Sequence, residues 1–234
     1  MPGPHFRQFG PPHLAAIALA AALAAGLTFW ARRSRSRAPA RWAGRALAVV
    51  LLANEAIYLL RGLQVAPLPE FARHFLPLHI CGVAVFLTAW VLLRPNPYAY
   101  EIAYFWGLGG TVQAILTPSL TAGEGFPSYW FFTFFIAHGG TVAGVVLATW
   151  GLGLRPARGA VVRVVVVSNL YMLAVAGINA LLGANYMFLC APPAGATPLF
   201  FLPWPWYIAF LDLLGVAIVL LLCLPFAIEK RLRA

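Results

Sequence analysis

A cysteine and a histidine within apolar segments are the residues of this chain best suited to nucleophilic chemistry. Cys81 lies in LPLHICG, and His138 lies in FFTFFIAHGG. A thiolate is a strong nucleophile, and an imidazole can take its proton and later return it to a leaving group. An acidic residue such as Glu55 or Asp212 could orient the imidazole in a triad-like arrangement. From these residues alone the alternative stays open, because a lone cysteine in an apolar helix is commonly inert packing.

Other polar residues also fall within apolar segments, where a polar group is costly and is a functional-site hypothesis by default. We expect one polar cluster facing the interior, since this costs less than several isolated groups. Proton relay or substrate binding in a transporter is the second interpretation of the same residues. No paired metal-ligand spacing is present, so no metal site is predicted. The supporting candidates are Asn54, Glu55, His79, Gln113, Asn179 and Asp212.

The composition places these residues in a membrane protein. The chain has 234 residues, of which 62% are hydrophobic and 9% charged, whereas soluble domains carry about 25% charged residues. So few charges cannot cover a water-soluble surface of this size. The formal charge of +10 does not indicate nucleic-acid binding, because the basic residues form short runs between apolar stretches. Membrane lipids are therefore the expected partners.

Apolar stretches of about 20 residues, the length that crosses a bilayer as a helix, define the expected elements. They do not alternate as barrel strands do. We predict a single transmembrane domain over 1–234, an all-α polytopic bundle of seven transmembrane helices. The 183–205 segment is expected to form a folded outer cap or a re-entrant hairpin. The predicted helices are 13–31, 44–62, 73–93, 100–117, 128–150, 162–182 and 206–228.

Basic residues predict the orientation of this bundle. Thirteen Lys and Arg fall in the connections and tail on one side, against three on the other. The richer side is expected in the cytoplasm, which places the N-terminus outside and the C-terminus inside. Only Arg7 precedes the first span, whereas Arg32, Arg33, Arg35 and Arg37 follow it, so we expect a retained helix rather than a signal peptide. The predicted location is multi-pass in the bacterial inner, or plasma, membrane.

The order of several motifs resembles one known family over nearly the whole chain. FGPPHL at 9–14, NE at 54–55 and LPLHICG at 76–82 come first, followed by E…YFWGLGGTVQAILTP from 101 to 118. FFTFFIAHGG, N…GANYMFL and PWPWY then follow at 131–140, 179–189 and 203–207. This pattern resembles the YwaF-type bacterial integral membrane proteins, a family with seven predicted helices. That family is similar to eukaryotic multipass acyltransferases of ether phospholipids.

The resemblance implies a Cys–His centre, because a cysteine and a histidine within helices carry activity in the eukaryotic family. Cys81 and His138 stand at the matching positions. The implied function is transfer of an acyl chain between phospholipid and lysophospholipid, with Cys81 as nucleophile and His138 as base. No soluble cofactor is required. Hydrolysis of the lipid is the variant in which water reaches the thioester. The non-enzymatic alternative is a small-solute transporter or a seven-helix binding or receptor-like protein.

Overall fold

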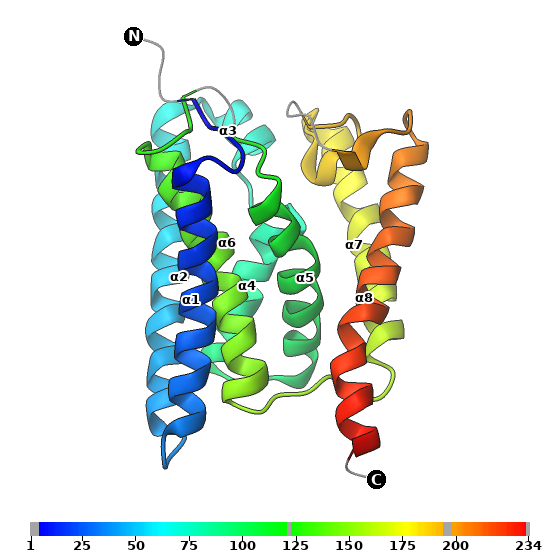
Figure 1. Cartoon of the computed structure of the whole chain (residues 1–234). Coiled ribbons are helices and arrows are strands. Elements are labelled where there is room, and N and C mark those ends of the chain that lie inside the picture. Colours follow the sequence, from blue (N-terminus) through cyan, green and yellow to red (C-terminus); the bar gives the residue numbers. More distant parts are fainter. Residues whose placement is uncertain (1–4, 121–122, 194–197, 233–234) are drawn as a thin grey trace.

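The computed structural model describes residues 5–120, 123–193 and 198–232, and it is helical throughout, with no strand in these ranges (Figure 1). Two short 3-10 turns, η2 (Tyr186–Phe188) and η3 (Pro198–Phe200), lie between the last two helices. A π-helical turn, η1 (Leu147–Gly151), continues α6. The α-helices are α1 (Pro11–Arg33), α2 (Ala38–Val65), α3 (Leu68–His74), α4 (Ile80–Leu93), α5 (Pro97–Leu116), α6 (Tyr129–Val146), α7 (Ala160–Leu182) and α8 (Trp206–Leu232).

Five of these helical segments are long and apolar enough to cross a membrane: α1, α2, α6 with η1, α7 and α8. A helix also lies in each of the two other predicted ranges. The range 100–117 is occupied by α5, and the range 73–93 differs most from expectation. Its first residues belong to the short helix α3, which ends at His74, and α4 begins only at Ile80. The physical reason for this break is Pro77, which cannot donate within a helix and restricts Leu76 before it.

Close packing holds α1, α2, α4, α5 and α6 together in one bundle, called here the five-helix bundle. Glycines let its helices approach. A Cβ added at Gly144 of α6 would lie 2.6 Å from Thr88 Cγ2 of α4, and one at Gly140 would lie 2.8 Å from Leu51 Cδ2 of α2. Real Cβ atoms do not approach so closely, so these positions require glycine. These two glycines stand four residues apart, a GxxxG spacing that favours close packing of membrane helices.

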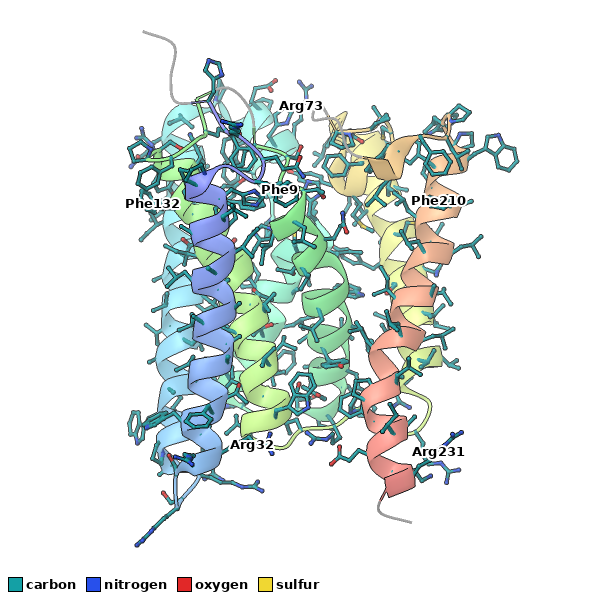
Figure 2. All side chains as sticks on the ribbon, in the orientation of Figure 1. Phe9, Arg32, Arg73, Phe132, Phe210 and Arg231 are labelled. Carbon is teal, nitrogen blue, oxygen red and sulfur yellow. The ribbon has the colours of Figure 1, made fainter. Side chains whose placement is uncertain are left out.

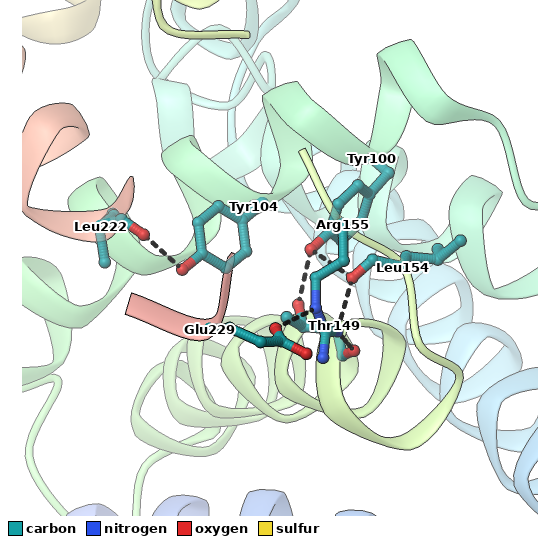
Figure 3. A network of polar contacts seen from close by, with 7 residues as sticks. All are labelled: Tyr100, Tyr104, Thr149, Leu154, Arg155, Leu222 and Glu229. Atoms are coloured by element: carbon teal, nitrogen blue, oxygen red, sulfur yellow. Dashed lines mark hydrogen bonds and ion pairs between the residues drawn. The ribbon is translucent and has the colours of Figure 1, made fainter. Parts of the chain in front are cut away.

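The α7–α8 pair stands beside the five-helix bundle and next to α5 (Figure 1). It is fastened to the bundle by side-chain hydrogen bonds along its length. Trp106 Nε1 of α5 donates to Ser168 Oγ of α7 at 2.8 Å, and Tyr104 OH donates to the Leu222 carbonyl of α8 at 3.0 Å. Figure 3 shows the second bond within a wider polar network that also joins Arg155 to Glu229 of α8. We call this line of contacts the seam.

The two ends of the molecule carry different basic residues. α1 begins and α8 ends at opposite ends of the structure (Figure 1). Arg32 and Arg231 lie at one end and Arg73 at the other (Figure 2). This agrees with the division of basic residues that the sequence predicts, although which end faces the cytoplasm stays a prediction. The two ends are called below the Arg32 end and the Arg73 end.

Candidate functional site

The break before α4 determines where Cys81 lies. Residues 75–79 leave the helical path, and His79 occupies the N-cap position of α4 with extended backbone angles (φ −70°, ψ 148°). A Cβ at Gly82 would lie 3.2 Å from three backbone atoms of Pro77, so Gly82 lets this segment fold over the first turn of α4. The sequence LPLHICG therefore encodes a helix break, an N-cap and the space that the break needs.

Cys81 is the second residue of α4, a short apolar helix. α4 has 14 residues and is therefore about 21 Å long, shorter than the roughly 30 Å hydrocarbon core of a bilayer. Its thiol is free and half-buried. The sulfur lies at the first turn of α4, close to the start of the helix. N–H groups in the first turn of a helix have no intrahelical partner and attract negative charge.

Tyrosine hydroxyls satisfy the backbone groups that the helix break leaves unpaired. Tyr186 OH accepts from the Leu76 N–H at 3.0 Å and donates to the Ala72 carbonyl at 2.8 Å. Tyr171 OH of α7 donates to the Leu78 carbonyl at 2.8 Å. Non-helical backbone at membrane depth is tolerated only when such partners are supplied by the protein. Burial raises the pKa of Tyr186, so its hydroxyl keeps its proton at neutral pH.

A strained turn at 186–188 packs on this segment. Met187 and Phe188 both have positive φ angles, 57° and 55°. Such backbone costs about 1–3 kcal/mol per residue and persists only where the surroundings impose it. Here Asn179 Oδ1 accepts from the Tyr186 N–H and Asn179 Nδ2 donates to the Tyr186 carbonyl, both at 2.9 Å. Tyr207 OH donates to the Phe188 carbonyl. The turn directs the Met187 N–H at His79 Nδ1, which it meets at 3.2 Å.

His138 lies on α6 with one ring nitrogen engaged and one free. Its Nδ1 lies 2.8 Å from the Phe134 carbonyl, and its ring stacks on the Phe134 ring at a centroid distance of 4.0 Å. A carbonyl only accepts, so Nδ1 carries the proton. The Nε2 atom is buried and has no hydrogen-bond partner among the described residues. The free Nε2 therefore holds the lone pair, and His79 lies within electrostatic range of the ring.

The acidic residue of this region is Glu55 of α2, which is buried. Its carboxyl group interacts electrostatically with Cys81 and Tyr58 and makes no hydrogen bond to a described residue. Asn54 points elsewhere and donates to the Thr133 carbonyl of α6 at 3.2 Å. The structure thus brings Glu55 near Cys81 and His79 near His138. No hydrogen bond joins Cys81 to His138 in the described part of the chain.

Two other candidates make their hydrogen bonds away from this region, and a third, Asn179, belongs to it. Gln113 Nε2 donates to Thr117 Oγ1, one turn along α5, at 2.8 Å. Asp212 of α8 accepts from Asn169 Nδ2 of α7 at 3.2 Å. Asn179 holds the 186–188 turn. No group of three or more His, Cys, Asp or Glu side chains suited to a metal ion occurs among the described residues.

Sequence reasoning missed the residues that position His79. Tyr171 and the Met187 N–H were not candidates, although GANYMFL belongs to the quoted motifs. The ideal-helix geometry for residues 73–93 places His79 and Cys81 about 200° apart. This geometry does not apply, because His79 stands outside the helix. Two consecutive positive-φ residues without glycine leave no readable sequence signal, so the turn could not be found from the chain alone.

One known family of proteins matches the chain over nearly its whole length. The model of the TMEM164 family, a family of multipass membrane proteins, matches residues 8–223. The chain belongs to the TMEM164 family. The matched range in this TMEM164-family protein runs from before α1 into the second half of α8 and includes the break before α4 and the 186–188 turn. Neither the curated proteins nor the solved structures contain a match to the chain.

Proposed function

We propose that this protein is an intramembrane acyltransferase that moves an acyl chain from a phospholipid to a lysophospholipid through Cys81. The observation that carries the proposal is the state of His138. Its Nδ1 is committed to the Phe134 carbonyl, and its basic Nε2 is buried without a partner. An unpaired buried nitrogen is costly unless a ligand or a reaction uses it. A general base with its lone pair free fits that requirement.

The proposed reaction has two balanced halves. His138 Nε2 takes the Cys81 proton, and the thiolate attacks the ester carbonyl carbon of the donor lipid. The C–O bond breaks, the leaving alkoxide takes the proton from His138, and a thioester remains on Cys81. In the second half His138 deprotonates the hydroxyl of a lysophospholipid, whose oxygen attacks the thioester. The C–S bond breaks, and the leaving thiolate takes the proton back from His138. Exclusion of water favours transfer over hydrolysis.

The surroundings of Cys81 support a lipid substrate and set the roles of the other residues. Cys81 lies at the start of an apolar helix, directly after a helix break, and this setting favours an acyl ester of the bilayer as the substrate class. Glu55 lies within electrostatic range of Cys81, where a carboxylate charge would oppose thiolate formation, so the proposed reaction requires Glu55 in its neutral form. We assign seven spans by counting α4 and α5 with the five long apolar segments. The Arg73 end then faces outside, and the lipids come from the outer leaflet of a bacterial cell membrane.

The test uses the purified protein in nanodiscs that contain phosphatidylcholine with a labelled acyl chain, together with unlabelled lysophosphatidylcholine. Mass spectrometry follows the label into new phosphatidylcholine and onto cysteine-containing peptides. Wild type is compared with Cys81→Ala, and Cys223→Ala and Cys190→Ala serve as matched thiol controls. Of the three cysteine variants, we expect only Cys81→Ala to lose transfer. His138→Ala should lose transfer as well, and the wild type should carry an acyl adduct on Cys81.

The non-enzymatic alternative predicts the opposite pattern. In a transporter the half-buried Asp212 and the buried Glu55 are the essential groups, and Cys81→Ala retains function. Absence of transfer in wild type across donor lipids of several headgroups and chain lengths would exclude the acyltransferase proposal for those lipids. Transfer that survives in Cys81→Ala would exclude Cys81 as nucleophile. Appearance of free fatty acid in place of labelled lipid would change the assignment to a hydrolase.

A further inference from the structure

The two histidines of the candidate site are fixed in opposite proton arrangements. His138 carries its proton on Nδ1, because that atom bonds the Phe134 carbonyl. His79 accepts the Met187 N–H at its Nδ1, so in the neutral ring its proton must be on Nε2. Each side chain therefore presents Nε2 without a hydrogen bond to a described residue, one as an acceptor and the other as a donor. A base and an electrophile are the pair that acyl transfer needs.

The strained 186–188 turn fixes the orientation of the His79 imidazole and the position of its proton. The rings of Tyr186 and Phe188 flank the imidazole at centroid distances of 5.5 and 5.2 Å. The Met187 N–H reaches Nδ1 only because residues 187 and 188 adopt left-handed backbone conformations. Asn179 and Tyr207 hold that turn in place. Strain sustained by so many contacts is typical of functional sites.

We infer that His79 Nε2–H forms the oxyanion site of this protein and stabilises the negative oxygen that develops when Cys81 attacks an acyl ester. The ligand class is the carbonyl group of an acyl ester or thioester. This inference rests on the proposed acyltransferase function and extends it to a residue with a defined role. A neutral imidazole can polarise a carbonyl oxygen in this way.

The position of His79 in the chain suits that role. It is the N-cap of α4, two residues before Cys81, so the helix start that places the sulfur also places the imidazole. The imidazole therefore lies on the same side of the chain break as the thiol, at the start of one helix. As the tetrahedral intermediate forms, the ester C=O becomes C–O⁻, and His79 Nε2–H donates to it. The bond returns to C=O when the alkoxide leaves.

The experiment separates ester chemistry from thiol chemistry at the same sulfur. All variants are made in a Cys190→Ala/Cys223→Ala background, so that Cys81 is the only thiol. Acyl transfer is measured in the nanodiscs described above, and alkylation of Cys81 by iodoacetamide is measured in parallel. Alkylation needs the thiolate but forms no oxyanion. His79→Leu removes the donor, His79→Gln restores an N–H at a similar distance, and His74→Leu is the control at an exposed histidine.

We expect His79→Leu to lower kcat for acyl transfer about 100-fold or more with little change in KM, as loss of one oxyanion donor does. Alkylation should change by less than about two-fold, because thiolate formation depends on His138 rather than His79. His79→Gln should recover most of the lost rate. ¹⁵N spectra of histidine-labelled protein should show an Nε2-protonated ring that disappears in His79→Leu.

Three results would overturn the inference. Unchanged transfer in His79→Leu would remove His79 from the reaction. A parallel fall of transfer and alkylation would mean that His79 only positions Cys81. An Nδ1-protonated His79 in the labelled spectra would contradict the assigned proton arrangement. Absence of transfer in wild type, with normal alkylation, would instead contradict the proposed function itself. The inference about His79 would then lose its basis.

Discussion

The surroundings of the glycines differ between the five-helix bundle and the α7–α8 pair. In the five-helix bundle, a Cβ at Gly107, Gly140 or Gly144 would lie 3.0 Å or less from a side chain of a neighbouring helix. In the α7–α8 pair, Gly177 and Gly215 have no such atom within 4 Å. The pair contributes only Ala160, Val164 and Val219 to the buried residues of the main apolar core.

This difference teaches where each part gets its stability. Lipid is as apolar as leucine, so helices in a membrane associate through close packing and interhelical hydrogen bonds. The five-helix bundle uses mainly the first, and the seam uses mainly the second. Substitutions that remove a polar contact should therefore act on the seam, whereas substitutions that add volume should act on the bundle. The following predictions test that division.

The largest effect is expected for Glu101→Gln at the Arg32 end of the seam. Glu101 of α5 is 2% exposed and accepts from Arg163 Nε and Nη2 of α7 and from the Ala157 N–H. An amide carries N–H groups that oppose the guanidinium donors, and we expect a loss of about 3 kcal/mol in unfolding free energy. Titration with SDS measures that loss, and hydrogen exchange should increase in α7 and α8 first.

Glu229→Gln is the matched control, because it removes the charge of the half-exposed pair with Arg155 at the same end. Partly exposed ion pairs contribute about 0–1 kcal/mol. Equal losses in the two variants, or exchange that rises first in the five-helix bundle, would contradict the division between bundle and seam.

The next effect is expected for Asn179→Ala, which removes the grip on Tyr186. Two buried hydrogen bonds are lost, with an expected cost of about 2 kcal/mol. Because the turn holds His79, kcat for acyl transfer should fall by more than the loss in unfolding free energy alone would explain. Thermal unfolding and kcat are compared with those of Asn185→Ala, whose side chain binds the exposed residues 190 and 191. Retention of full transfer in Asn179→Ala would show that the turn does not position His79.

Gly144→Ala tests the five-helix bundle. The added methyl would lie 2.6 Å from Thr88 Cγ2 and 3.0 Å from Leu92 Cδ1, so α4 and α6 must separate. Overpacking of this kind costs about 1–3 kcal/mol. Gly177→Ala adds the same methyl to α7 in open space and should be neutral or stabilising by up to about 1 kcal/mol. SDS titration of both variants measures the contrast, and similar values would disprove it.

The smallest effect is expected for Tyr104→Phe. This change removes the hydrogen bond to the Leu222 carbonyl and leaves the buried ring in place (Figure 3). The expected loss is about 1 kcal/mol. Tyr98→Phe removes the same hydroxyl from a 63% exposed ring and should change nothing measurable. Faster proteolysis near α8 in Tyr104→Phe, without loss of bundle stability, is the expected signature.

The sequence was sufficient to find the helices because crossing a bilayer imposes a length and an apolar composition that can be read directly. It was not sufficient to place the start of α4. Pro77 accounts for the break itself, but the unwound segment is stable only because Tyr171 and Tyr186, each about 100 residues away, bond its backbone. Hydropathy contains no information about such partners.

The candidate site divides in the same way. The sequence named Cys81, His138, His79 and Glu55 because polar groups in apolar helices are rare. It could not give their proton arrangements, which depend on the Phe134 carbonyl and the Met187 N–H. Nor could depth alone separate these residues from Gln113 and Asp212, whose partners lie on their own helix or across the α7–α8 pair.

The bond between Met187 and His79 has a consequence for biogenesis. The two residues are separated by 108 positions in the chain. At about 5–20 residues per second, the ribosome therefore adds Met187 roughly 5–20 s after His79. During that interval the nascent chain contains the thiol and the first helices but not the turn that orients the imidazole. The proposed oxyanion site is completed only by late synthesis, so an incomplete chain already inserted among lipids would act on them far more slowly than the finished protein.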